Sequence, residues 1–148
     1  MSIHEFMTAY GRVWEAQDSE GFAGLFAPGG RYWNTPFQSQ DTPQALAAYW
    51  DRIKLQEDIS FRSEVLAETE RGGVAHWHVE YRVASEELFE IWARSTGTPV
   101  PARAPGEPLP RMVLDGVLVA EFDATGLATE VRIWWHSMAE TGDARTDA

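Results

Sequence analysis

The sequence predicts an α+β domain in which amphipathic helices come first and an antiparallel sheet follows. Over about the first 53 residues, apolar side chains recur every three or four positions, as on one face of a helix. From Ile59 onward they recur at every second position, as in strands that bury one face. The chain has 148 residues, a length that predicts one domain with a sizeable core.

Capping signals mark the first two helices. Ser2 and Glu5 have the spacing of a capping box, and the apolar stripe that follows them extends to about residue 17. Asp18 is suited to begin a short second helix. We expect the Pro-Gly-Gly sequence at residues 28 to 30 to end it, because neither residue type continues a helix.

A short strand and a third helix come next. Residues 31 to 35 have a strand pattern, and Pro36 ends it. Thr42 is a suitable N-cap, and Pro43 fits the first position of a helix. The sequence therefore predicts three helices before most of the sheet.

Residues 59 to 138 predict an antiparallel meander of four strands. The clearest strand, residues 75 to 83, alternates strictly between apolar and polar side chains. Its apolar set is Ala75, Trp77, Val79, Tyr81 and Val83, and its polar set is His76, His78, Glu80 and Arg82. The last two strands, residues 112 to 122 and 128 to 138, flank a turn with glycine at its positive-φ position.

An irregular insertion at residues 86 to 110 precedes the last two strands. Its first part, up to residue 95, has the pattern of a short helix. Residues 96 to 110 hold five of the eight prolines, so they do not form a central strand. This loop is either an excursion from the sheet or a lid over a pocket. We expect a single domain over residues 1 to 138 and a flexible tail over residues 139 to 148.

Composition argues against several functional classes. Twelve Lys and Arg against 23 Asp and Glu give a formal net charge of -11, which disfavours a nucleic-acid partner. The absence of cysteine excludes disulfides and a thiol nucleophile, and it fits a reducing compartment. With no signal-like start and no spanning apolar stretch, we expect a cytoplasmic protein without a membrane partner.

Several short segments match a known superfamily in order and spacing. They are residues 10 to 18, 25 to 27, 32 to 37, 47 to 50 and 122 to 136. With these segments the chain resembles the nuclear transport factor 2-like superfamily, in particular its SnoaL-like and ketosteroid-isomerase-like branch. The resemblance implies a cone in which a curved sheet wraps around the helices, a cavity at the wide end, and a homodimer through the outer sheet face.

The ketosteroid isomerases of this superfamily supply one candidate catalytic residue. The resemblance places their oxyanion-hole tyrosine on Tyr10. Their two aspartates, however, fall on Thr35 and Leu118. Because both carboxyl groups are missing, steroid isomerisation by that mechanism lacks its base.

The limonene epoxide hydrolases supply two further candidates. Tyr32 and Asn34, followed by Pro36, match the pattern that helps hold a water molecule in those enzymes. Their water-activating aspartate falls on Ile133. In the only register that keeps polar residues, their Arg-x-Asp pair falls on His78 and Glu80, against the alternation of that strand.

Aromatic residues predicted to face inward would line a cavity suited to an apolar, aromatic or polycyclic small molecule. These candidate ligand-binding residues are Trp14, Trp50, Trp77, Tyr81 and Trp135. The same side chains could equally be ordinary core.

Polar residues on the late strands resemble a metal cluster. The set is His76, His78 and Glu80, beside Glu130, Arg132 and His136. Alternation places it on the convex face, so we expect neither a metal ion nor a cofactor. Asp115 and His78 are reserve candidates for a general acid or base, and burial would raise the pKa of Asp115.

The sequence favours a SnoaL-like protein that binds a small molecule. If it is an enzyme, it would be a cofactor-independent isomerase, cyclase, dehydratase or epoxide hydrolase that acts by proton transfer. Tyr32 and Asn34 would then orient the substrate or a water, and Tyr10 would stabilise developing charge on oxygen. The alternative is a non-catalytic ligand-binding or protein-interaction module.

Overall fold

A computed structural model describes residues 1–83, 85–99, 104 and 106–140. Its elements are helices α1 (Ile3–Glu15), α2 (Ser19–Ala23), α3 (Pro43–Trp50) and α4 (Glu86–Thr96), the 3₁₀ helix η1 (Asp51–Leu55), and strands β1 (Phe26–Thr35), β2 (Gln38–Gln40), β3 (Gln56–Thr69), β4 (Gly72–Val83), β5 (Arg111–Phe122) and β6 (Ala128–Glu140). The predicted α+β class is confirmed. Of the described residues, none belongs to a helix long and apolar enough to cross a membrane.

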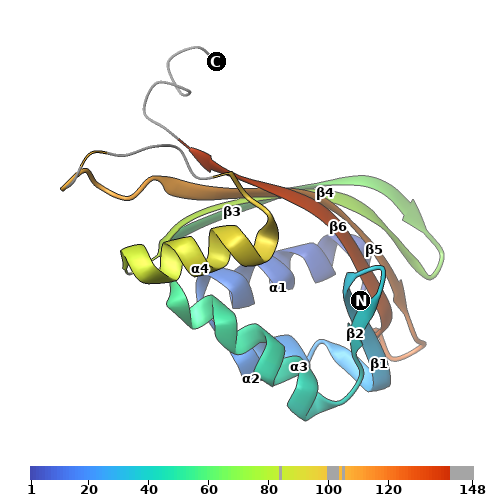
Figure 1. Cartoon of the computed structure of the whole chain (residues 1–148). Coiled ribbons are helices and arrows are strands. Elements are labelled where there is room, and N and C mark those ends of the chain that lie inside the picture. Colours follow the sequence, from blue (N-terminus) through green and yellow to red (C-terminus); the bar gives the residue numbers. More distant parts are fainter. Residues whose placement is uncertain (84, 100–103, 105, 141–148) are drawn as a thin grey trace.

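The six strands form one sheet in the order β2-β1-β6-β5-β4-β3. Strands β3 to β6 pair antiparallel in sequence order, as the meander prediction required. Strand β1 pairs in parallel with β6, and this makes the sheet mixed. The sheet is strongly curved, and all four helices lie on its concave side (Figure 1).

The predicted helix caps are present. Ser2 and Glu5 form a capping box at α1, and the Asp18 side chain accepts from the Gly21 N–H at α2. The Thr42 side chain caps α3 in the same way, with Pro43 in the first turn. Local capping chemistry therefore fixes where these helices begin.

Residues 28 to 30 were expected to end the second helix, and this expectation is wrong. Helix α2 ends at Ala23, and the Pro-Gly-Gly sequence lies inside β1, where the pairing with β6 shifts register. A Cβ on Gly30 would lie 2.5 Å from the Ala128 carbonyl oxygen. Glycine is thus needed for a close backbone approach in an irregular strand.

Strand β4 carries the predicted alternation. Its five apolar side chains, from Ala75 to Val83, are at most 4% exposed and belong to the core. The intervening polar residues lie on the convex face, where His78 and Glu80 are half-buried and Arg82 is exposed. The concave face of β4 therefore packs on the helices, and the convex face carries the ionisable groups.

The first part of the insertion forms α4, capped by the Ser85 side chain. Helix α4 lies under the sheet near the end of β6 (Figure 1), and the Thr98 hydroxyl is hydrogen bonded to that of Ser137. Of the loop at residues 96 to 110, expected to be either an excursion or a lid, residues 100–103 and 105 lie outside the described residues, as do residues 141–148 of the expected tail. Strand β6 extends to Glu140, two positions past the expected domain end.

Candidate functional site

A pocket of about 200 Å³ lies on the concave side, between the sheet, α3 and α4. It is lined by Trp14, Tyr32, Tyr49, Trp50, Arg52, Ile53, Gln56, Trp77, Tyr81, Trp92, Ser95, Thr96, Leu114, Ile133 and Trp135. All five predicted ligand-binding residues are in this set. Of the predicted catalytic residues, Tyr32 lines the pocket, whereas Tyr10 and Asn34 do not.

The floor of the pocket is closed. Tyr32, Trp50, Trp77 and Tyr81 are each only 1% exposed. At the rim, Trp92, Thr96 and Trp135 are half-buried, and Arg52 and Ser95 are exposed. A molecule that enters would therefore meet the rim residues first, and the floor aromatics below them act as a rigid base.

Tyr10 and Tyr32 form a buried pair behind the pocket. Their hydroxyl oxygens are 2.8 Å apart, so one hydroxyl donates to the other. Burial raises the pKa of Tyr10, which the hydrogen bond with Tyr32 offsets in part. Burial, together with the nearby Tyr10 and Tyr49, also raises the pKa of Tyr32. Both groups are neutral hydrogen-bonding groups at neutral pH, and Tyr10 is linked to the pocket through Tyr32.

Asn34 is held by its neighbours in the strand β1 region. Its side-chain oxygen accepts from the Gln40 amide at 3.2 Å, and its backbone carbonyl accepts from the Trp135 indole at 3.1 Å. Asn34 therefore fixes the position of Trp135 at the pocket rim. Its side chain makes an amide contact with β2, a strand that the sequence pattern did not predict.

Trp14 and Trp77 lie side by side in the core, with ring centroids 5.5 Å apart. The Trp14 indole donates to the buried Gln56 side chain at 2.8 Å. The buried Trp77 indole nitrogen, by contrast, has no hydrogen-bond partner among the described residues. The two rings are similar in burial but differ in whether their polar atom is satisfied.

The charge of the pocket differs from that of the chain. Among the described residues that line it, none is aspartate, glutamate or histidine, and Arg52 is the one formally charged side chain. Within the described part of the chain, no carboxylate or imidazole is hydrogen bonded to the side chain of Tyr32 or Asn34. The pocket thus offers neutral donors and one cation.

The reserve candidates His78 and Asp115 lie on the convex face, as alternation predicted for Asp115. His76 and His78 contact the two Asp115 carboxylate oxygens at 2.7 and 2.8 Å. Partial burial would raise the pKa of Asp115, but the hydrogen bonds from His78 and His76 hold it below its ordinary value. The raised pKa considered for a buried Asp115 is therefore not found, because this carboxyl is half exposed and paired.

Nothing in the described structure gathers the convex-face residues into a metal site. No three histidine, aspartate or glutamate side chains of that part of the chain could hold one ion together. Glu130 instead accepts hydrogen bonds from Trp33 and Arg132. The polar residues of β4 to β6 form pairs, some within one strand and some between strands.

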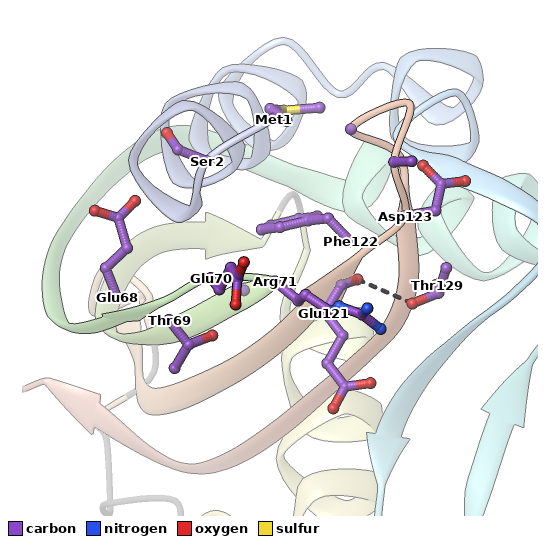
Figure 2. Close-up of a pocket in the computed structure, with 13 residues that line it drawn as sticks. Met1, Ser2, Glu68, Thr69, Glu70, Arg71, Glu121, Phe122, Asp123 and Thr129 are labelled. Carbon is purple, nitrogen blue, oxygen red and sulfur yellow. Dashed lines mark hydrogen bonds between the residues drawn. The ribbon is translucent and has the colours of Figure 1, made fainter.

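A second, larger depression lies at the opposite end of β4, around the β3–β4 and β5–β6 turns. Figure 2 shows Glu68, Glu70, Glu121 and Asp123 around it, with Met1 and Phe122 on the side of α1. It shares no lining residue with the aromatic pocket. Its acidic rim matches the net charge of the chain and brings none of the predicted site residues together.

Sequence reasoning missed several lining residues. Tyr49 and Trp92 belong to apolar helical stripes, and this signal could have identified them as inward-facing. Arg52 and Gln56 follow α3 at the junction with β3. No local pattern marks these two residues, because their role arises from contacts with distant parts of the chain.

The family follows from a match to the model of the SnoaL-like domain over residues 7–140. The chain belongs to this family. A comparison with curated proteins found no match.

Solved structures with the same fold include proteins of diverse description. The epoxide hydrolase/cyclase-like enzyme SalBIII, described for pyran ring formation in the polyether salinomycin, has 10% identity and a TM-score of 0.67 over 93% of this chain and 95% of that one. A protein assigned as a scytalone dehydratase from Novosphingobium aromaticivorans has 12% identity and a TM-score of 0.64 over 94% and 86%. A computationally designed 17-OHP binder has 15% identity and a TM-score of 0.63 over 92% and 95%. At these identities the likeness concerns the fold.

Proposed function

We propose that this protein binds a small, apolar aromatic molecule in the pocket between the sheet and α4. The observation that supports this most is the composition of the lining, which holds five tryptophans and three tyrosines but no aspartate, glutamate or histidine among the described residues. Aromatic walls with a few polar groups are typical of small-molecule sites. The designed 17-OHP binder gives a precedent for ligand binding by this fold.

The volume argues for a ligand of about one ring. The pocket holds about 200 Å³, and an apolar cavity of about 150 Å³ is known to accept benzene. Drug-sized ligands occupy cavities of roughly 300 Å³ or more. A polycyclic ligand would require α4 to move away from the sheet, whereas a ring with one short substituent would not.

A rim-blocking variant tests the binding site. Phenylacetamide serves as a neutral one-ring probe, and its affinity is measured by isothermal titration calorimetry. Ser95→Phe places a bulky side chain at the pocket rim and should abolish binding. Ile91→Phe, on α4 but outside the lining, is the matched control and should leave affinity within about twofold, as expected for a surface change. Equal affinities of the two variants would contradict the proposed site.

A second candidate function is cofactor-independent catalysis by proton transfer. The buried Tyr10–Tyr32 pair favours it, because Tyr32 can accept from Tyr10 and donate its own proton to a substrate oxygen. The names of SalBIII and the dehydratase suggest cyclisation, epoxide opening or dehydration as reactions to assay. With no acidic or imidazole side chain in the described lining, the proton acceptor would be water or the substrate itself.

Tyr32→Phe separates the two functions. In an enzyme, it should lower kcat on a one-ring epoxide or hydroxyketone by about 10²-fold or more, the scale of a lost oxyanion donor, with a smaller change in KM. Asn34→Ala keeps the backbone carbonyl that Trp135 donates to but removes the Gln40 contact that holds this part of β1. It should raise KM more than it lowers kcat. In a binding protein, no turnover of such substrates would be measured with any variant.

We also propose a homodimer through the convex sheet face, in a cytoplasmic protein. Trp134 and Met138 are 47% and 48% exposed on β6 of that face, and Val117 lies beside Trp134 on β5. Exposed large apolar side chains on one face favour association. Sedimentation of Trp134→Asp should give a monomer if this face is the interface, and an unchanged mass would contradict it.

A further inference from the structure

We propose that the natural ligand of the aromatic pocket is an aromatic carboxylate whose acid group pairs with Arg52 at the pocket rim. This inference rests on the proposed function, because it names the class of molecule that the same pocket would bind. The ligand would place its ring among the rim aromatics Trp92 and Trp135 and its carboxylate at the guanidinium. Two features of the rim support it.

The first feature is the sign of the charge. The chain has a formal net charge of -11, yet the described lining of this pocket contains one cation and no carboxylate. An anionic ligand therefore meets locally opposite charge in a protein that otherwise repels it. The pocket discriminates in favour of anions through this one side chain.

The second feature is that Arg52 is held in place with donors to spare. Its Nε donates to the Tyr49 carbonyl at 3.0 Å, and its guanidinium carbon lies 3.9 Å from the centre of the Tyr49 ring. Arg52 takes part in none of the ion pairs formed within the described residues. Its two terminal nitrogens can thus form the bidentate contact that a carboxylate favours, with little further ordering of the side chain.

The adjacent acid does not neutralise Arg52. The Asp51 carboxylate accepts from the Ser19 hydroxyl at 2.6 Å and pairs with Lys54 at 2.9 Å. The positive charge of Arg52 instead acts on Tyr32 and Tyr49 of the pocket, whose pKa would be higher still without it. Burial raises the pKa of Tyr49, and the charge of Arg52 counters part of that rise.

Matched acid and amide probes test the inference. Phenylacetate and phenylacetamide have nearly the same shape, so calorimetry at low salt compares their affinities for the whole chain. The acid should bind about tenfold more tightly to the wild type, the scale of one charge-assisted contact. Arg52→Gln should abolish this preference, so that the acid binds no more tightly than the amide, and Arg52→Lys should retain part of it. Arg94→Gln, a cation of α4 outside the lining, should retain all of it.

The outcomes separate this inference from the proposed function. If the amide and the acid bind equally, or if Arg52→Gln keeps the preference for the acid, the role of Arg52 is overturned while the aromatic site stands. If neither probe binds the wild type, both the one-ring site and the carboxylate are overturned. Because Arg52 is exposed, Arg52→Gln should fold, and an unchanged circular dichroism spectrum and thermal unfolding midpoint check this.

Discussion

The concave and convex faces of the same three strands, β4 to β6, carry opposite chemistry. On the concave side, Trp77, Tyr81 and Ile133 line the pocket or its floor and are at most 4% exposed. On the convex side, His76 and Asp115 are half exposed and hydrogen bonded to each other. On these strands the paired histidine and carboxylate side chains therefore lie outside, and the side chains that exclude water lie inside.

This difference constrains what the pocket can do. A site that abstracts a proton needs a base within hydrogen-bond reach of the substrate. Among the described residues that line the pocket, none is aspartate, glutamate or histidine. The concave face provides shape, neutral donors and the charge of Arg52, which together suit selective binding.

The largest expected effect comes from a carboxylate placed on the wrong face. Val79 is 0% exposed on the concave side, so Val79→Asp buries an unpaired charge and should cost more than about 4 kcal/mol. Val119→Asp makes the same change on the convex side, opposite Arg132, and should cost about 1 kcal/mol. Urea unfolding compares the two, and similar losses would contradict the assignment of the faces.

Alkaline pH should lower the free energy of unfolding through the buried tyrosines of the concave side. All four tyrosines have a raised pKa, in each case mainly through burial. Above a pH of about 10 the unfolded chain loses these protons while the folded chain keeps them, so the free energy of unfolding falls as pH rises, by up to about 1.4 kcal/mol per pH unit for each tyrosine. Absorbance at the tyrosinate band should rise only together with loss of the folded circular dichroism signal. Tyrosinate formation in the folded protein near pH 10 would refute the prediction.

The two neighbouring core tryptophans should respond differently to the same substitution. Trp14→Phe leaves the buried Gln56 side-chain oxygen without the indole donor, whereas Trp77→Phe removes an indole N–H that has no partner among the described residues. Both lose packing, so Trp14→Phe should be the more destabilising by about 1 to 3 kcal/mol. Thermal and urea unfolding of both variants measure this difference. Equal losses would mean that the Gln56 contact contributes nothing.

The smallest effect is expected on the convex face. Hydrogen bonds from His78 and His76 outweigh partial burial and hold the pKa of Asp115 below 3.8, its ordinary value, so this pairing contributes stability above that pH and loses it as pH falls through the lower folded pKa. Because the carboxylate is 50% exposed, Asp115→Asn should cost less than about 1 kcal/mol at neutral pH. In Asp115→Asn, the free energy of unfolding should also fall less between neutral and acid pH than in Asp41→Asn, which changes an exposed carboxylate. An unchanged acid profile would contradict the pairing.

Local rules predicted much of the fold. Capping at Ser2, Asp18 and Thr42 depends on residues a few positions apart, and so does the two-residue alternation that placed Asp115 outward. The parallel pairing of β1 with β6 and the register shift at Gly30 did not follow from the sequence, since they depend on a strand about 100 residues away.

The candidate site was predicted only where local patterns determine it, and not where contacts between distant residues do. Inward-facing aromatics such as Trp77 and Trp135 follow from alternation. The Tyr10–Tyr32 pair and the Trp14–Gln56 pair join residues separated by 22 and 42 positions, so their hydrogen bonding is set by packing. Arg52 has no sequence signature, because the acid-free lining around it forms only when distant parts of the chain pack together.

The seven indole N–H signals of this protein allow the most direct test. Five tryptophans line the pocket, and the remaining two, Trp33 and Trp134, do not. In ¹H–¹⁵N spectra recorded during titration with phenylacetate, the indole signals of the pocket tryptophans should shift, with Trp92 and Trp135 at the rim shifting most. The signals of Trp33 and Trp134 should stay in place. Shifts confined to Trp33 and Trp134, or no shift at millimolar probe, would contradict the claim that the concave aromatic pocket is the binding site.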